Sequence, residues 1–265
     1  MSVVMLVGSH PRHAYLANRL YQAGRLAGLV VERREAFVPE PPQGLSPDLV
    51  GLYRHHFDQR DRAEARHFGA EVRFPETVPR LEVARDELNS GAVRAFLAGV
   101  PARLLLSYGV HMLAQETLAA SPARHRWNLH GGLSPWYRGC TTHFWPSYLL
   151  EPQMTCFTVH ELTDRLDHGP VIHQTGTELV RGDGLHDLAC RAVQVLAADL
   201  PRLAVLADQD EVAARAHTSA GRLWLARDWR PEHLRPVYQH HGDRIVDMCL
   251  DGVVGGREPE LLRQW

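Results

Sequence analysis

The sequence predicts an α/β fold, a Rossmann-like and mostly parallel sheet with helices on both faces, followed by a small C-terminal subdomain. Short apolar runs, of the kind found in buried parallel strands, alternate with longer segments of helical periodicity. Residues 3–31 show the order first, as apolar run, helical segment and second apolar run, which is the order of a βαβ unit. Strands that alternate with helices in this way favour a parallel sheet.

The N-terminal half supplies most of the predicted sheet. Its strands are predicted at residues 3–7, 26–31, 72–78 and 102–108. Its helices are predicted at residues 11–24, 49–68, 90–97 and 112–120. Asn89 or Ser90 is expected to cap the third helix, because a short polar side chain can accept from a free backbone N–H of the first turn. The proline-rich segment 37–47 is predicted to be a loop.

The second half continues with strands at residues 126–130, 154–162 and 169–179 and a long amphipathic helix at residues 184–206. A short helix ending at Leu150 is expected to be capped by Thr141 or Thr142. Beyond about residue 208 the composition becomes rich in Trp, Arg and His. The chain is therefore divided into a catalytic domain, residues 1–207, and a small C-terminal subdomain, residues 208–265.

Composition excludes several classes of function. The formal net charge of −2 argues against a nucleic-acid-binding protein that depends on electrostatic attraction. All 29 basic residues are arginine, so a lysine Schiff base, a pyridoxal phosphate anchor and a P-loop lysine are excluded. No apolar run approaches the ~20 residues of a membrane helix. The 17 histidines include no H-E-x-x-H pair, and no metal site is expected.

The cysteines and the N-terminus bear on location. Cys140, Cys156, Cys190 and Cys249 are scattered without a C-x-x-C pair, which is typical of reduced thiols. The N-terminal residues show no basic leader and no cleavage pattern, so no signal peptide is expected. The sequence thus predicts a cytoplasmic protein.

Three segments that follow predicted strands are expected to meet in one cleft. Sites on open α/β sheets gather outside the carboxyl ends of the strands. Ser9 and His10 follow the first strand, Tyr108 ends the strand at 102–108 and Gly109 follows it, and Asn128 lies in the strand at 126–130. We therefore predict that Ser9, His10, Tyr108 and Gly109 bind substrate. No G-x-G-x-x-G follows the first strand, so the dinucleotide fingerprint is missing.

The run "NLHGGLSPWYRG", residues 128–139, contains the strongest catalytic candidates. Residues two apart on a strand point the same way, so Asn128 and His130 project together. An alternative interpretation is that Asn128 and His130 are only the polar end of a strand before a turn. A lone Asp-x-Gly, such as the one at Asp167, is likewise usually only a turn. Arg138 binds a carboxylate or phosphate, or it fixes the turn through backbone carbonyls.

Together Asn128, His130 and Asp167 supply an amide donor, an imidazole base and a carboxylate, which suits acyl transfer. No serine or cysteine nucleophile with an adjacent base is evident, so direct attack by a substrate amine is the natural form. His160 is interpreted as a structural histidine rather than a base.

The run "NLHGGLSPWYRG", followed by "TVHELTDRLDHGPVIHQ", resembles the folate-dependent formyltransferase family. The resemblance rests on an Asn-x-His strand end before a turn, and on a T-x-H element before a D-x-G-P loop. It spans roughly residues 1–205 and includes "LLLSYGVHMLAQETLAA". The turn Gly-Gly-Leu-Ser-Pro departs from the family's usual Ser-Leu-Leu-Pro, and Gly-Ser-His-Pro-Arg after the first strand is unlike the phosphate-cradling loop of the glycinamide ribonucleotide enzymes.

The resemblance implies 10-formyltetrahydrofolate as the formyl donor and assigns roles to the trio. Asn128 would donate to the formyl oxyanion, His130 would act as general base or share in oxyanion stabilisation, and Asp167 would hold His130 or a water. The implied pterin pocket is lined by His111, Met112, Leu113, Thr163, Asp164 and Leu166.

The resemblance also guides the choice of acceptor. Among the family, amino-sugar N-formyltransferases match this chain best, with a similar core and a small C-terminal appendage. The expected substrate is an amino sugar, possibly nucleotide-linked. Alternatives are formylation of a non-sugar amine, hydrolysis of the donor by water, and a non-catalytic binding protein on the same fold.

The apolar residues of segment 221–250 predict a homodimer. Leu223, Trp224, Leu225 and Trp229 begin a stretch with too much apolar surface for a solvated appendage. The stretch either packs back on its own core or pairs with a copy of itself, and the sugar formyltransferases favour the second. "GRLWLARDW" is also expected to add an edge strand.

Overall fold

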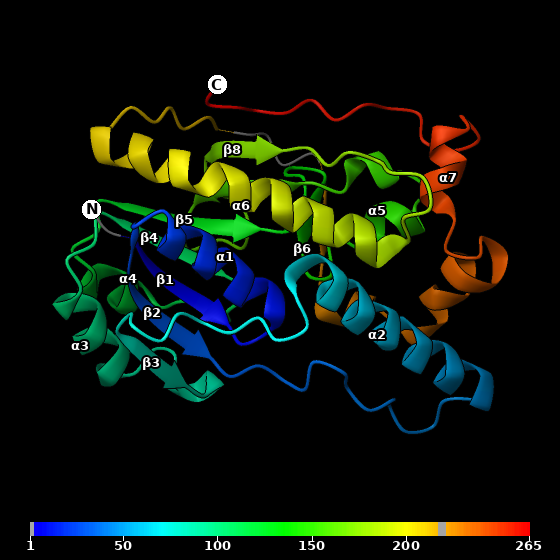
Figure 1. Ribbon diagram of the computed structural model, residues 1–265, viewed down its shortest axis with the longest axis horizontal. Coiled ribbons are helices and arrows are strands. Elements are labelled where there is room, and N and C mark those ends of the chain that lie inside the picture. Colours follow the sequence, from blue (N-terminus) through cyan, green and yellow to red (C-terminus); the bar gives the residue numbers. More distant parts are fainter. Residues whose placement is uncertain (1–2, 217–220) are drawn as a thin grey trace.

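Figure 1 shows the computed structural model of the chain, which describes residues 3–216 and 221–265. The strands are Val3–Gly8 (β1), Leu26–Glu32 (β2), Arg80–Val83 (β3), Leu104–Tyr108 (β4), His125–His130 (β5), Tyr137–Gly139 (β6), Phe157–Glu161 (β7), Val171–Thr175 (β8) and Arg222–Trp224 (β9). The α-helices are Pro11–Gln22 (α1), Pro47–Phe68 (α2), Gly91–Gly99 (α3), Gln115–Ala120 (α4), Trp145–Tyr148 (α5), Leu185–Gln209 (α6) and Ile245–Leu250 (α7). Short 3₁₀ helices lie at Arg85–Glu87, Pro152–Met154, Ala226–Asp228 and Pro231–His233, and a π-helix at Arg235–His240.

The main sheet has seven strands in the order β3-β2-β1-β4-β5-β7-β8. Strands β1 to β5 pair in parallel, and β7 and β8 are antiparallel to their neighbours. The carboxyl ends of β1, β2, β4 and β5 therefore share one edge of the sheet. The predicted mostly parallel α/β sheet is confirmed.

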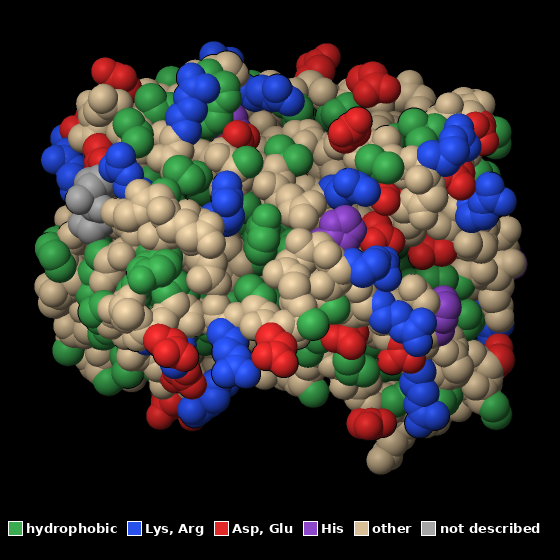
Figure 2. Space-filling model, viewed as in Figure 1, with side chains coloured by type: hydrophobic (Ala, Val, Ile, Leu, Met, Phe, Trp, Pro, Cys, Tyr) green, Lys and Arg blue, Asp and Glu red, His purple; other side chains and the backbone are tan. Residues whose placement is uncertain are grey.

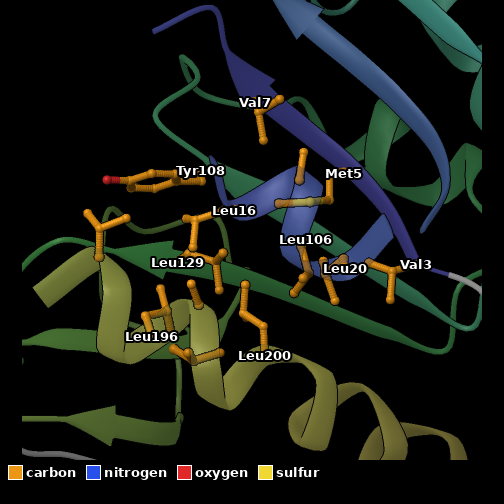
Figure 3. Close-up of a cluster of buried hydrophobic side chains, with 14 of the residues drawn as sticks. Val3, Met5, Val7, Leu16, Leu20, Leu106, Tyr108, Leu129, Leu196 and Leu200 are labelled. Carbon is orange, nitrogen blue, oxygen red and sulfur yellow. The ribbon is translucent and has the colours of Figure 1, made fainter. Parts of the chain in front are cut away.

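Helices cover both faces of this sheet. α1, α2 and α6 pack on one face, which Figure 1 shows in front, while α3 and α4 pack on the other. Figure 3 shows how Leu16 and Leu20 of α1 meet Leu196 and Leu200 of α6 over Met5 of β1. All five side chains are fully buried or within 1% of it, and each stabilises the fold by about 1.5–3 kcal/mol relative to exposure.

Local sequence signals explain several helix ends. α1 begins with Pro11, whose missing N–H is no loss in a first helical turn. The hydroxyl of Ser90 accepts a hydrogen bond from Val93 N at 3.4 Å, so Ser90 is the cap of α3 and one of the two predicted candidates is confirmed. α6 ends at Asp210 in the left-handed region, at φ 56°.

The predicted strand at residues 72–78 is wrong. The edge strand β3 instead begins at Arg80 and pairs with β2. Val72 and Phe74 pack against the core from a loop. Pro75 and Pro79 lack the N–H that a paired strand needs, and only the carbonyl of Pro79 joins the sheet, by accepting from Leu29 N at 2.9 Å.

Two predicted helices are shorter than expected. α4 begins at Gln115 rather than at residue 112. α5 contains four residues and begins at Trp145, so neither Thr141 nor Thr142 caps it. Thr141 has a left-handed φ of 58°, and the hydroxyl of Thr142 donates to the Gly131 carbonyl. Both threonines thus belong to the turn after β6.

The C-terminal residues pack on the rest of the chain. β9 pairs in parallel with β6, and the buried ring of Trp224 stacks on Trp145 with centroids 4.0 Å apart and an interplanar angle of 14°. Leu234 and Val237 are buried in the same cluster as Leu133. The predicted edge strand is confirmed, whereas the domain boundary at residue 207 stays a prediction.

The surface is mixed in character. Figure 2 shows basic and acidic side chains interspersed over one face, with small apolar groups between them. Within residues 3–216 and 221–265, every helix is too short or too polar to cross a bilayer.

Candidate active site

Strand register brings three polar side chains side by side at the carboxyl end of β5. Asn128 of β5 lies opposite Ser107 of β4 on one side and opposite His160 of β7 on the other. His130 follows two residues later on the same face. The predicted common orientation of Asn128 and His130 therefore has a structural basis in the pairing of β4, β5 and β7.

Asp167 reaches this group from the loop between β7 and β8. Its backbone is in the left-handed region, at φ 46°, and its side chain is buried. One carboxylate oxygen, Oδ1, accepts from Asn128 Nδ2 at 3.3 Å, and Oδ2 accepts from Gly139 N at 2.7 Å. Oδ2 also lies 3.4 Å from His130 Nδ1. The structure thus brings the three predicted catalytic residues together.

Burial and charge set the protonation of the pair. Burial lowers the pKa of His130, and the nearby carboxylate of Asp167 only partly offsets this, so the imidazole is neutral at pH 7. Burial alone would raise the pKa of Asp167, but His130, His160 and the Gly139 N–H together hold it well below its usual value. A neutral base therefore lies beside a carboxylate anion.

The hydrogen bonds of His130 define which nitrogen is the base. Nε2 lies 2.7 Å from the Tyr137 carbonyl, which can only accept, so the neutral ring carries its proton on Nε2. The lone pair of Nδ1 then faces Asp167. A proton taken up at Nδ1 would form an ion pair with the carboxylate, which stabilises the imidazolium.

The amide of Asn128 is held in one orientation. Ser107 Oγ donates to Asn128 Oδ1 at 2.8 Å, so Nδ2 faces Asp167 and His160 Nε2, the latter at 3.2 Å. His160 Nδ1 lies 2.8 Å from the Glu161 carbonyl and carries the ring proton, which leaves Nε2 as an acceptor. The amide N–H groups are thus directed into the site.

The glycines of the turn explain why the chain bends so sharply after His130. A Cβ at Gly132 would collide with the Tyr137 carbonyl and with His130 Nε2, which would break the contact that fixes the imidazole. Gly139 has a φ of 92°, and a Cβ there would collide with the Trp224 backbone. Both glycines allow close backbone approach at the site.

Sequence reasoning missed parts of this site. Ser107 was not singled out, and His160 was interpreted as structural although it contacts both Asn128 and Asp167, the latter at 3.4 Å. A serine at the end of the apolar run 102–106 was the available signal for Ser107. The Gly139 N–H and the Tyr137 carbonyl are backbone groups, so residue type alone does not predict that they contact Asp167 and His130.

The predicted substrate-binding residues lie near the carboxyl edge of the sheet, but most of them already contact other residues of the chain. Ser9 Oγ accepts from Arg34 N at 2.9 Å, and His10 Nε2 lies 3.0 Å from the Glu35 carbonyl. Tyr108 is a core residue, and Gly109 leaves space for the ring of His13. Arg138 donates to the Gly221 carbonyl at 3.3 Å, so it fixes the turn as one of the two interpretations expected.

The predicted pterin residues come from two segments that approach each other. Leu113 and Leu162 pack against the same buried cluster. Met112 is 68% exposed and Leu166 43% exposed, which leaves two large apolar side chains uncovered. His111 Nδ1 and its backbone N–H bond to the buried carboxylate of Glu32. Thr163 and Asp164, the other two predicted residues, lie in the exposed loop before Asp167. The hydroxyl of Thr163 donates to the Arg165 carbonyl.

Metal binding has no support in the described ranges. Within residues 3–216 and 221–265, no three His, Cys, Asp or Glu side chains are arranged to hold a metal ion.

A family profile and several solved structures match this chain. The profile of the family described as Formyl transferase matches residues 58–202, which is more than half of the sequence. The chain belongs to the formyl transferase family. The matched region begins in α2, ends in α6 and contains Asn128, His130 and Asp167. The predicted family is confirmed.

Individual relatives of this formyl transferase are distant. The bifunctional polymyxin resistance protein ArnA of Wigglesworthia glossinidia brevipalpis is 28% identical over 89 residues, which cover 33% of this chain and only 13% of ArnA. The formyltransferase PseJ from Anoxybacillus kamchatkensis, solved with UDP-4,6-dideoxy-4-formamido-L-AltNAc and tetrahydrofolate, has a TM-score of 0.52 at 14% identity, with 96% of this chain and 98% of PseJ covered. Glycinamide ribonucleotide transformylase 1 from Symbiobacterium toebii has a TM-score of 0.52 at 20% identity, with 82% and 94% covered. The two structures share the fold.

Proposed function

We propose that this formyl transferase moves a formyl group from 10-formyltetrahydrofolate to a primary amine. The observation that carries the proposal is the convergence of Asn128, His130 and Asp167 in one buried group, within a chain that belongs to the family. PseJ was solved with tetrahydrofolate, which supports a folate donor. The uncovered side chains of Met112 and Leu166 suit an apolar ring system.

The residues of the site account for each proton and charge of the transfer. 10-Formyltetrahydrofolate would supply a formyl group on a nitrogen that can leave as part of tetrahydrofolate. The amine attacks the formyl carbon, and Asn128 Nδ2 exchanges its 3.3 Å hydrogen bond to Asp167 Oδ1 for one to the oxygen that becomes negative. His130 Nδ1 takes a proton from the attacking nitrogen, and Asp167 stabilises the imidazolium. The proton then passes to the leaving nitrogen as the C–N bond to the donor breaks.

We propose an amino sugar, possibly nucleotide-linked, as the acceptor. Support comes from PseJ, whose bound product is a UDP-linked formamido sugar and which this chain matches over 96% of its length. The loop Gly8-Ser9-His10-Pro11-Arg12 is occupied by side chains, with His10 and Arg12 both bonded within the chain. This loop is unlike the phosphate-cradling loop expected for a glycinamide ribonucleotide substrate.

A panel of acceptors tests both statements. Purified protein is incubated with 10-formyltetrahydrofolate and, separately, with amino sugars, their nucleotide-linked forms and simple alkyl amines. We expect one class of amino sugar to gain the mass of CO, with an equal amount of tetrahydrofolate released. Release of tetrahydrofolate without any amine would favour a hydrolase. Formylation of the alkyl amines alone would overturn the sugar assignment, and folate binding without turnover would favour a binding protein.

We also propose a homodimer built on residues 221–250, in a cytoplasmic protein with reduced cysteines. Most apolar side chains of this segment pack on the chain itself, but Leu223 of β9 remains 38% exposed, as does Trp136, which directly precedes β6. We expect light scattering at micromolar concentration to give about twice the chain mass of 29.9 kDa. Leu223→Asp should give a monomer, with exposed Leu149→Asp as the control; a monomeric wild type would refute the dimer.

A further inference from the structure

Among residues 3–216 and 221–265, no carboxylate forms an ion pair with Arg60 of α2. The Arg60 guanidinium carbon lies 4.3 Å from the ring centre of Phe37 and 4.6 Å from that of Phe57. A terminal nitrogen donates to the Phe37 carbonyl. The Nε atom is buried and has no hydrogen-bond partner among the described residues. Buried polar atoms of this kind are rare unless a ligand or water completes them.

The neighbouring arginines are already neutralised. Arg12 forms a forked pair with Glu64, a buried carboxylate, through Nε at 2.8 Å and through the second terminal nitrogen. Arg34 lies 3.5 Å from Glu32 and 3.3 Å from Glu35. Burial, with repulsion from Arg12, lowers the pKa of Arg60 to about 10, and the attraction of Glu64 and Glu35 does not offset this. Arg60 thus remains a cation with unused donors.

A second unpartnered polar atom lies in the same region. His143 Nε2 is buried without a hydrogen-bond partner among the described residues, and its ring lies against Gly131, next to His130. Burial lowers its pKa to about 3, so the ring is neutral. The Phe37 ring lies 5.1 Å from that of His10, which follows β1, so Arg60 lies near the carboxyl end of β1, whereas His143 lies near the end of β5.

We propose that Arg60 binds a phosphate group of the acceptor, while the amine lies at His130. The inference rests on the proposed function. Because β4 separates β1 from β5, a group at the end of β1 is about 10 Å from one at the end of β5. An amino sugar with a phosphate on another carbon spans such a distance. Phe37 and Phe57 pack against the guanidinium and one terminal nitrogen donates to the Phe37 carbonyl, so Nε and the other terminal nitrogen are the donors left to match phosphate oxygens.

Calorimetry of inorganic pyrophosphate binding to the full chain tests this proposal without any formyl transfer. Arg60→Gln should weaken pyrophosphate binding about tenfold or more, since a charge-assisted hydrogen bond is lost. The matched control is Arg62→Gln, which removes the same charge from an exposed position on the same helix and should bind like wild type. Equal affinity of Arg60→Gln and wild type, or no binding to wild type, overturns the proposal.

Two further arms separate this role from its alternatives. We expect Phe37→Leu to bind pyrophosphate like wild type. If Arg60 only holds the loop after β2 in place, Phe37→Leu will weaken pyrophosphate binding as much as Arg60→Gln does, and the proposal fails. Succinate in place of pyrophosphate should bind at least tenfold more weakly, and a preference for succinate would contradict a phosphate site. Asp167→Asn should bind pyrophosphate like wild type, so loss of formyl transfer and loss of phosphate binding are distinguishable.

Discussion

Asp167→Asn is expected to lower formyl transfer about 10²–10⁴-fold, the range seen when general acid–base catalysis is lost. The carboxylate accepts from Gly139 N at 2.7 Å and lies 3.4 Å from His130 Nδ1. An amide in its place cannot stabilise an imidazolium, so His130 loses the partner that makes it a competent base. The loss should appear in kcat with little change in KM, because the carboxylate acts in the transition state. Single-turnover kinetics with excess enzyme measures this directly.

A second readout separates chemistry from misfolding. The negative charge of Asp167 raises the pKa of His130 against the effect of burial, so Asp167→Asn should lower that pKa further. The ring protons of His130, followed by NMR against pH, report the shift. Asp86→Asn removes an exposed carboxylate elsewhere and should leave turnover and the His130 pKa unchanged. Turnover of Asp167→Asn within tenfold of wild type would remove Asp167 from the mechanism.

The sequence predicts well the strands and helices whose structure is determined by their own residues. β1 and β4 are continuous runs of buried apolar residues, and α6 has an apolar face that covers the sheet along its length. Their local pattern and their place in the fold agree. The order of these elements was sufficient to predict the class of sheet, because parallel strands need crossover helices.

Elements decided by distant contacts were predicted poorly. The helical pattern of residues 49–68 does not predict that His56 of α2 is buried, with Nδ1 2.8 Å from Tyr238 Oη and 3.2 Å from His186 Nε2. Both partners lie more than a hundred residues away. Helical periodicity identifies the polar face of a helix, but not a polar cluster that buries part of that face.

The site shows the same division. Asn128 and His130 were predictable because the two-residue period of a strand fixes their common direction. Ser107 and His160 join them only through the pairing of β4, β5 and β7, and that register depends on three strands at once. The turn threonines were assigned to a helix cap, although Thr142 serves the Gly131 carbonyl, because short polar side chains suit both roles.

Asn128→Ala is expected to lower turnover about 10²–10³-fold, the usual effect of removing one oxyanion donor. Nδ2 of Asn128 is directed toward Asp167, because Ser107 holds the amide oxygen on the opposite side at 2.8 Å. Its contribution grows as charge develops on the formyl oxygen, so kcat should fall while KM for the donor stays close to wild type. Ser107→Ala should have a smaller effect in the same direction, since the amide remains but loses the contact that orients it. A fall in the Ser107 variant equal to that in Asn128→Ala would mean that orientation matters as much as the donor itself. Near-normal kcat in Asn128→Ala, measured with chemistry rate-limiting, would show that another group stabilises the oxyanion.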